Sequence, residues 1–341
     1  MNYRRLGNTG LKVSELCLGT MTFGSRFFTI GTVDQPMANA MVVKALESGV
    51  NFFDTADVYS YGESETMLGR ALQHARADRD AVVIATKVRG AMSEAAMKGT
   101  GDPNNVGLSR KHILASCEAS LRRLGTDHID LYQVHGWDAA APMEEALRAL
   151  DDLVRQGKVR YVGCSNWAAR QVARAVTLAG ERGWERFVSL QAYYSLADRD
   201  LEHELLPLCR EEGLGVLPWS PLSGGLLTGK YRRGAAGPEG ARRVDFDFPP
   251  VDDRAFDAVD ALDAVASARG TSIPRAALAW LLARPGVTSV IIGARTMAQL
   301  EDNLGATGLA LSEEEMEQLS ATTRPPVLYP QWMIERQNAG R

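Results

Sequence analysis

The sequence predicts an α/β fold, a (β/α)8 TIM barrel whose bottom is closed by an N-terminal β-hairpin. Short apolar segments rich in Val and Ile alternate with helical segments, and eight such strands can be counted. Strands that alternate strictly with helices form parallel sheets with right-handed crossovers. Eight alternations favour closure into a barrel over an open sheet. No linker divides the chain, so residues 1–341 are expected to form a single domain.

The hairpin is expected ahead of the repeating pattern, between Tyr3 and Val13. It turns at Gly7-Asn8-Thr9-Gly10, where residue types that tolerate a positive φ gather. Because it precedes the first strand, it is expected to cover one end of the barrel. The barrel strands are predicted, in chain order, at Glu15–Leu18, Val50–Asp54, Ala81–Lys87, His128–His135, Val159–Ser165, Val188–Ala192, Gly215–Trp219 and Ser289–Gly293.

Helices are expected between the strands, because capping residues begin the intervening segments and several of them end at a glycine. They are predicted at 34–48, 64–74, 109–124, 142–156, 168–179, 201–212 and 253–283. Three segments do not fit the repeating unit: 91–107, 232–250 and 322–341. The first two follow strand ends, where a barrel carries its substrate loops; the alternative is that either segment is disordered.

The composition narrows the class of protein. A net charge of −4 and a pI near 5.8 give no basic face for nucleic acid. The N-terminus lacks the apolar core of a secretory signal, and no apolar run approaches the ~20 residues of a membrane helix. The four cysteines are scattered and are interpreted as reduced thiols: Cys17, Cys117, Cys164 and Cys209. A cytoplasmic protein is therefore expected.

Three predicted strands end on side chains suited to chemistry. Asp54 ends the second strand, Lys87 the third and His135 the fourth, while Tyr59 follows Asp54 in the loop. Such positions form the active-site rim of a parallel barrel. A phenol has an ordinary pKa of ~10, and a nearby ammonium lowers it by stabilising the phenolate. A desolvated lysine needs a carboxylate partner, and an imidazole can orient a substrate oxygen. The four residues are thus predicted to form an acid–base relay for reduction of a carbonyl by hydride.

Each member of this set also has a plainer interpretation. Lys87 and Asp54 are compatible with a structural ion pair, and His135 with a histidine of the core. Tyr61 competes with Tyr59, and the spacing alone does not choose between them.

Other motifs were weighed and set aside. The segment 224–231, GGLLTGKY, nearly matches a phosphate-binding loop but has Tyr231 where a Mg²⁺-binding Ser or Thr is required. No GxGxxG opens a helix after a strand, so a Rossmann dinucleotide site is not predicted. No cluster of His or Cys has the spacing of metal ligands, so no metal is expected.

Five segments resemble the aldo-keto reductases in sequence and in order. They are NFFDTADVYSYGESE, HIDLYQVHGWD, GKVRYVGCSNW, PWSPLSGGLLTGKY and IIGARTMAQLEDN. The resemblance covers almost the whole chain and is greatest to the branch that includes potassium-channel β-subunit-like proteins and bacterial oxidoreductases. It implies that Tyr59 rather than Tyr61 is the general acid. It further implies that Lys87 lowers the pKa of Tyr59, Asp54 is the counter-ion of Lys87, and His135 orients the carbonyl.

The resemblance also implies NADP(H), bound in an extended form across the C-terminal mouth of the barrel. Ser165, Asn166 and Gln191 would hold the carboxamide of the nicotinamide. The ring and pyrophosphate would be wrapped by Trp219, Ser220, Pro221, Leu222, Gly224 and Lys230, and the adenosine half would be held by Gly293, Arg295, Gln299, Asp302 and Asn303. The first strand ends would add Gly19, Thr20, Met21 and Asp54, and either Arg242 or Arg243 would fold over the cofactor as a clasp.

One of these assignments also has independent physical support. A guanidinium after the last strand can bind the 2′-phosphate bidentately, so Arg295 favours NADP over NAD.

The substrate is expected to be a small carbonyl compound whose identity depends on variable loops. Gly136 and Trp137 follow His135, where many relatives carry Trp or Arg, so contacts there depart from the family pattern. Candidates for the pocket wall are Phe23, Tyr61, Trp137 and Trp167, each with core packing as the alternative.

The expected function is NADP(H)-dependent reduction of aldehydes or ketones to alcohols. The alternative is an NADP(H)-binding redox-sensing or regulatory subunit with slow turnover, and a weaker third is a hydrolase or lyase without cofactor. The branch includes monomers and assemblies, which leaves a homo-oligomer open.

Overall fold

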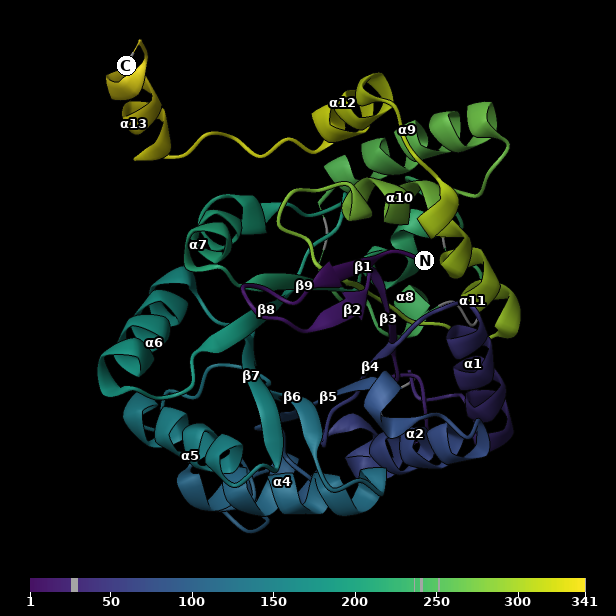
Figure 1. Ribbon diagram of the computed structural model, residues 1–341. Helices are drawn as coiled ribbons and strands as arrows, with labels where there is room; N and C mark the ends of the chain where they lie inside the picture. The colour runs from purple at the N-terminus through teal and green to yellow at the C-terminus, as the bar shows by residue number, and fades with distance from the viewer. Residues whose placement is uncertain (26–29, 236, 240–241, 251, 341) are drawn as a thin grey trace.

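The computed structural model describes residues 1–25, 30–235, 237–239, 242–250 and 252–340. Eight parallel strands form a nearly closed barrel in the order β10-β3-β4-β5-β6-β7-β8-β9 (Figure 1). Val216 in β9 forms a parallel bridge with Val287, just before β10, and so brings the two edges together. The strands are β3 Leu16–Gly19, β4 Phe52–Asp54, β5 Val83–Val88, β6 Ile129–Val134, β7 Val159–Ser165, β8 Phe187–Tyr193, β9 Gly215–Trp219 and β10 Val290–Ile292. The predicted (β/α)8 barrel is confirmed.

Helices surround the barrel and cover the outer faces of its strands (Figure 1). The longer ones are α1 Gln35–Glu47, α2 Glu63–His74, α4 Arg110–Leu124, α5 Met143–Arg155, α6 Ala169–Arg182, α7 Leu205–Glu212, α9 Arg254–Arg269, α10 Ile273–Leu282, α11 Met297–Leu304 and α12 Glu313–Thr322. The C-terminal α13 Gln331–Asn338 instead stands apart from the barrel and buries no residue (Figure 1). In the described part of the chain, no helix combines the length and apolarity needed to cross a membrane.

The structure differs from the predicted helices in several places. The helix predicted at 201–212 is a 3-10 turn at Asp200–Glu202 followed by α7, and α11 and α12 were not predicted. The single helix predicted at 253–283 is two, because Gly270 adopts φ 59° and ends α9. Ser272 then caps α10 by accepting a hydrogen bond from the backbone N–H of Arg275. The segments 91–107 and 232–250 contain short helices, α3 Glu94–Met97 and α8 Arg242–Asp245, and the C-terminal segment contains α13.

The N-terminal hairpin closes the bottom of the barrel, as predicted. Its strands, β1 Tyr3–Arg5 and β2 Lys12–Ser14, are antiparallel. Leu6 and Val13 are fully buried and pack against apolar side chains inside the barrel. That interior cluster also contains Cys17, Phe52, Val83, Ala85, Leu131, Leu217 and Ile291. The turn requires glycine at Gly7, whose φ is 57° and where a Cβ would lie 2.3 Å from a backbone oxygen of Val188.

The barrel interior changes from apolar to polar along its axis. In β5, Val83 and Ala85 belong to the apolar interior cluster, whereas Lys87, two residues further along, lies at the polar end. Alternate residues of a strand share a face, so one strand contributes to the floor and to the site above it. The outward residues Ile84 and Val88 belong instead to the core between strands and helices. The polar layer is therefore held at the C-terminal ends of the strands.

Candidate active site

A fully buried ammonium lies at the centre of the polar layer. Lys87 Nζ donates hydrogen bonds to Asp54 Oδ1 at 2.5 Å and to the backbone oxygen of Thr55 at 2.8 Å. It is 3.3 Å from the hydroxyl oxygen of Tyr59. Asp54 ends β4 and Lys87 lies in β5, the neighbouring parallel strand, so strand pairing brings the two charges together. The structure thus joins three of the predicted residues through one nitrogen atom.

Two buried amides bind the other carboxylate oxygen of Asp54. The side-chain nitrogen of Gln191 donates to Asp54 Oδ2 at 2.8 Å, and that of Gln133 donates to the same atom at 3.2 Å. The sequence analysis missed Gln133. The available signal was its position two residues before His135 in the same segment, which places both on one face of the strand.

Burial and charge oppose each other at Lys87 and at Tyr59. Burial alone would lower the pKa of Lys87, but the charges of Asp54 and Tyr59 and their hydrogen bonds outweigh it and raise the pKa above its usual value. Burial raises the pKa of the Tyr59 hydroxyl, and the opposing effect of Lys87 does not cancel it. The expectation that the pKa of Tyr59 is lowered overall is therefore not met in this structure. The effect of Lys87 has the expected sign, and desolvation is larger.

His135 lies beside Tyr59 at the end of β6. The two rings meet edge to face, with centroids 5.7 Å apart. Burial, then the charges of Lys87 and Arg89, lower the pKa of His135 to about 3. The imidazole is therefore neutral near pH 7 and can donate one ring N–H.

The loop after β4 adopts an unusual backbone that separates its two tyrosines. Ser60 and Tyr61 have φ values of 48° and 53°, which non-glycine residues rarely adopt. The hydroxyl of Tyr59 lies next to Lys87, whereas that of Tyr61 points to the sulfur of Met97 at 3.4 Å. Geometry therefore brings Tyr59, and not Tyr61, into contact with the buried ammonium.

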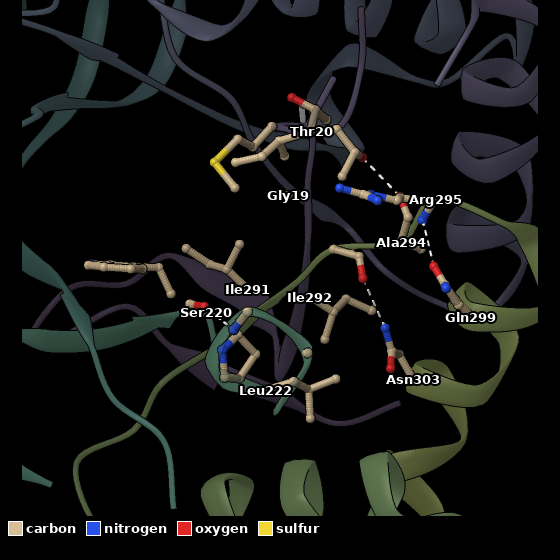
Figure 2. Close-up of a pocket in the computed structure, with 18 of the residues that line it drawn as sticks. Gly19, Thr20, Ser220, Leu222, Ile291, Ile292, Ala294, Arg295, Gln299 and Asn303 are labelled. Atoms are coloured by element: carbon tan, nitrogen blue, oxygen red, sulfur yellow. Dashed lines mark hydrogen bonds between the residues drawn. The ribbon is translucent and has the colours of Figure 1, made fainter. Parts of the chain in front are cut away.

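A cavity of about 800 Å³ opens beside Tyr59 and His135. It runs between the strand ends and α11, and Figure 2 shows Gly19, Thr20, Ser220 and Leu222 around it with Arg295, Gln299 and Asn303 at one side. Most of the predicted cofactor residues line it: Gly19, Thr20, Met21, Asp54, Ser165, Asn166, Gln191, Trp219, Ser220, Pro221, Leu222, Gly224, Lys230, Gly293, Arg295, Gln299, Asp302 and Asn303. Lys87 lies behind this lining, covered by Asp54 and Tyr59.

Arg243 is the predicted cofactor residue that the structure places elsewhere. Its guanidinium donates to the backbone oxygens of Ser223 at 3.1 Å and Pro249 at 2.8 Å, and it pairs with Asp247. It thus ties the segment 232–250 to the loop after β9 rather than lining the cavity. The side chain of its alternative, Arg242, lies outside the part of the chain that the structure describes.

The polar groups near His135 are of the kind that hold an amide. Asn166 has φ 56°, donates to the backbone oxygen of His135 at 3.0 Å and accepts from the indole N–H of Trp219 at 3.1 Å. The hydroxyl of Ser165 is buried and has no hydrogen-bond partner among the described residues. A buried hydroxyl without a partner is costly, so a ligand that bonds to it would fit this end.

The opposite end of the cavity is built around the start of α11. Thr296 caps this helix through the backbone N–H of Gln299. The side-chain oxygen of Gln299 accepts from the backbone N–H of Arg295 at 2.8 Å, and Asn303 donates to the backbone oxygen of Gly293 at 3.1 Å (Figure 2). Asp302 Oδ1 lies 2.8 Å from Nε of Arg275, whose positive charge offsets that of the carboxylate. A helix N-terminus and a guanidinium together favour an anion here.

Several lining residues were missed because they carry no chemical signal in the sequence. They are Thr22, Ile30, Gly225, Thr228, Phe246, Phe248, Pro274, Ile291, Ile292, Ala294 and Thr296. Phe246 and Phe248 come from the segment 232–250, and Phe248 stacks on Trp219 with ring centroids 5.9 Å apart. That segment therefore contributes an aromatic wall.

The four proposed substrate-wall residues lie outside the lining of this cavity. Phe23 and Trp167 are buried in the core between barrel and helices, as their alternative interpretation stated. Trp137 packs edge to face on Trp167, with centroids 4.9 Å apart, and Tyr61 points outward.

Comparison with known proteins gives relatives along nearly the full length. A model described as "Aldo/keto reductase family" matches residues 15–324. The uncharacterized oxidoreductase YrpG of Bacillus subtilis is 39% identical over 94% of this chain and 95% of its own. Versiconal hemiacetal acetate reductase of Aspergillus parasiticus is 33% identical over 97% of this chain and 99% of its own. A probable voltage-gated potassium channel subunit beta of Oryza sativa is 34% identical over 95% of this chain and 97% of its own.

The buried pair predicts a specific pattern of stabilities. Asp54→Asn leaves Lys87 without the charge that offsets its burial, so the free energy of unfolding should fall by about 3–5 kcal/mol. The double variant Asp54→Asn/Lys87→Met removes both charges and should be more stable than Asp54→Asn alone. Urea denaturation followed by circular dichroism measures both.

The matched control is the exposed pair of Glu94 and Lys98, 2.6 Å apart. Glu94→Gln should change the unfolding free energy little, because exposed pairs are screened by water. A double variant less stable than Asp54→Asn would contradict the assigned balance of charge and burial.

Proposed function

Since the chain belongs to the aldo/keto reductase family, we propose that it reduces aldehydes or ketones to alcohols with NADPH. Family membership supports an oxidoreductase that acts on carbonyl compounds. One observation carries the finer proposal. A single ammonium, Lys87, contacts Asp54 and Tyr59 at the wall of a large cavity, with the neutral imidazole of His135 beside them.

The proposed proton donor is Tyr59. Hydride for the carbonyl carbon is supplied by NADPH when it is bound. As negative charge develops on the carbonyl oxygen, the Tyr59 hydroxyl donates its proton and becomes a phenolate. Lys87 stabilises that phenolate: two unit charges ~4 Å apart attract by roughly 4 kcal/mol at an effective dielectric of ~20. His135 donates a hydrogen bond to the carbonyl oxygen of the substrate and fixes the position of that oxygen.

The raised pKa of Tyr59 suits this direction of reaction. A buried phenol keeps its proton before hydride arrives, so the acid form is present near pH 7. The neighbouring ammonium acts when charge appears, which is when stabilisation accelerates the step. Asp54 keeps Lys87 charged throughout, because it offsets the cost of burying the ammonium.

The cavity suits a nicotinamide dinucleotide at both ends. Ser165 offers a buried hydroxyl, and the amides of Asn166 and Gln191 offer further polar atoms for a carboxamide. Arg295 and the first turn of α11 would bind the 2′-phosphate, which supports NADP rather than NAD.

A regulatory subunit with slow turnover is the second candidate, supported by the likeness to a probable potassium channel subunit beta. Kinetics separate the two. One burst of NADPH oxidation followed by a stalled steady state would favour the regulatory subunit, whereas sustained turnover favours the reductase.

Removal of one hydroxyl tests the general acid. Tyr59→Phe should lower kcat for reduction of 4-nitrobenzaldehyde by about 10²–10⁴, the usual worth of general acid catalysis. NADPH binding, followed by fluorescence quenching, should persist. Tyr61→Phe, in the same loop, is the matched control and should retain the wild-type rate. A full rate in Tyr59→Phe would reject the assigned role.

The pH profile tests the two titrating groups. Since the pKa of His135 is about 3 and that of Tyr59 lies above its usual value, neither group changes charge near neutrality. We expect kcat/KM for reduction to be constant between about pH 6 and 9 and to fall only as Tyr59 deprotonates at higher pH. An inflection near ~6.5, the ordinary value for histidine, would mean that His135 titrates in the working range.

Cofactor choice tests Arg295. Arg295→Leu removes the proposed partner of the 2′-phosphate, so KM for NADPH should rise by about 10- to 100-fold while KM for NADH changes little. The exposed Arg170 of α6 provides the control, and Arg170→Leu should leave both values unchanged. An equal rise in KM for NADPH and for NADH would show that Arg295 does not select the 2′-phosphate.

A further inference from the structure

A strained residue follows β5 and leads the chain toward the active site. Arg89, two residues after Lys87, has a backbone φ of 138°, which residues other than glycine rarely adopt. Its backbone oxygen accepts from the N–H of Gly107 at 3.0 Å. At Gly90 a Cβ would lie 2.5 Å from Val58, the residue before Tyr59. Glycine thus lets this loop pack directly on the loop that carries Tyr59.

The guanidinium of Arg89 is fixed beside His135. Its Nε donates to the backbone oxygen of Trp137 at 3.0 Å. A Cβ added at Gly136 would lie 3.5 Å from Cδ and 3.6 Å from Nε of Arg89, so the side chain lies over this glycine. Gly136 directly follows His135, so the guanidinium of Arg89 lies next to the loop that carries the imidazole. Arg89 is also close enough to act on the charge of His135.

Arg89 differs from most of the other arginines that are at least partly buried, because it lacks an acidic partner among the described residues; Arg295, which is also partly buried, lines the cavity. Eight other arginines that are at least partly buried each pair with an aspartate or glutamate: Arg4, Arg79, Arg110, Arg123, Arg199, Arg243, Arg275 and Arg284. No carboxylate of the described residues forms an ion pair with Arg89. Asp138, in the loop that Arg89 contacts, accepts instead from the backbone N–H groups of Leu108 and Ala140.

A partly buried charge loses part of its hydration, and the fold supplies an acidic partner at the eight arginines just named. Strain combined with an unpaired charge next to a reactive group is typical of a functional position. We propose that the substrate carries a carboxylate beside its carbonyl-bearing part and that Arg89 binds this carboxylate. The inference rests on the proposed reductase function. Arg89 is then a specificity-determining residue: it positions the substrate while Tyr59 and His135 bind the carbonyl oxygen.

Two structural roles for Arg89 leave its charge unexplained. A neutral donor would bond equally well to the oxygen of Trp137. Burial and the charge of Lys87 each lower the pKa of His135 more than Arg89 does, so Arg89 is not needed to keep the imidazole neutral. The planar fork of the guanidinium matches a carboxylate, which it can bind through two parallel hydrogen bonds.

Matched substrates test the proposal in the presence of NADPH. We would compare 3- and 4-carboxybenzaldehyde with their methyl esters, which keep the aldehyde and shape but lack the charge. The wild type should prefer at least one carboxylate over its ester in kcat/KM. Arg89→Gln should reduce that ratio by about 10- to 100-fold, the usual worth of a hydrogen bond between charged groups. Arg89→Lys keeps the charge and should retain part of the preference.

Other outcomes separate the two proposals. If the wild type reduces acids and esters equally, or if Arg89→Gln lowers both equally, the carboxylate site is rejected and the reductase stands. If neither class of aldehyde is reduced, the reductase fails. Calorimetry with 4-(hydroxymethyl)benzoate and NADP⁺ then decides the site without turnover, since binding by the wild type that is lost in Arg89→Gln supports it. Absence of binding to the wild type overturns it.

Discussion

A single buried ammonium determines the design of the active end of this barrel. Lys87 is fully enclosed, and an isolated charge in such a position is too costly to persist. Asp54 supplies the opposite charge, and the backbone oxygen of Thr55 and the hydroxyl of Tyr59 occupy the remaining directions around the nitrogen. Gln133 and Gln191 in turn satisfy the second oxygen of Asp54. The polar layer exists because one charge has to be neutralised and hydrogen-bonded.

The apolar floor supports this layer from below. Leu6 and Val13 of the hairpin are fully buried against the interior of the barrel, which keeps water from that side. Electrostatic interactions are stronger where water is excluded, so the hairpin also strengthens the contact between Lys87 and its partners. The hairpin, which contributes no group to the cavity, thereby affects the chemistry that the cavity can support.

The sequence predicted those features that depend on local pattern. Alternation of helices and strands gave the barrel and all eight strands, and the strand ends gave the four clustered residues. It did not reveal Gln133: the spacing from His135 places both residues on one face of the strand, but the contact with Asp54 arises only when the barrel closes. Nor did it give the net effect on Tyr59, since the balance between burial and Lys87 depends on depth in three dimensions. The position of Arg243 depends on contacts with Ser223 and Pro249 that no spacing encodes.

Backbone strain identifies the same region without reference to any relative. Among the described residues other than glycine, positive φ values occur at Ser60, Tyr61, Arg76, Arg89, Asn166, Ser220 and Ser223. All but Arg76 lie in loops that follow barrel strands at the C-terminal end. Each such residue costs of order 1–3 kcal/mol and persists only where the surrounding structure holds it. A scaffold of paired strands with a dry floor can offset this cost, because its stability comes from elsewhere. The strained loops therefore gather where side chains surround the cavity: Asn166 and Ser220 line it, and Arg89 lies close to His135.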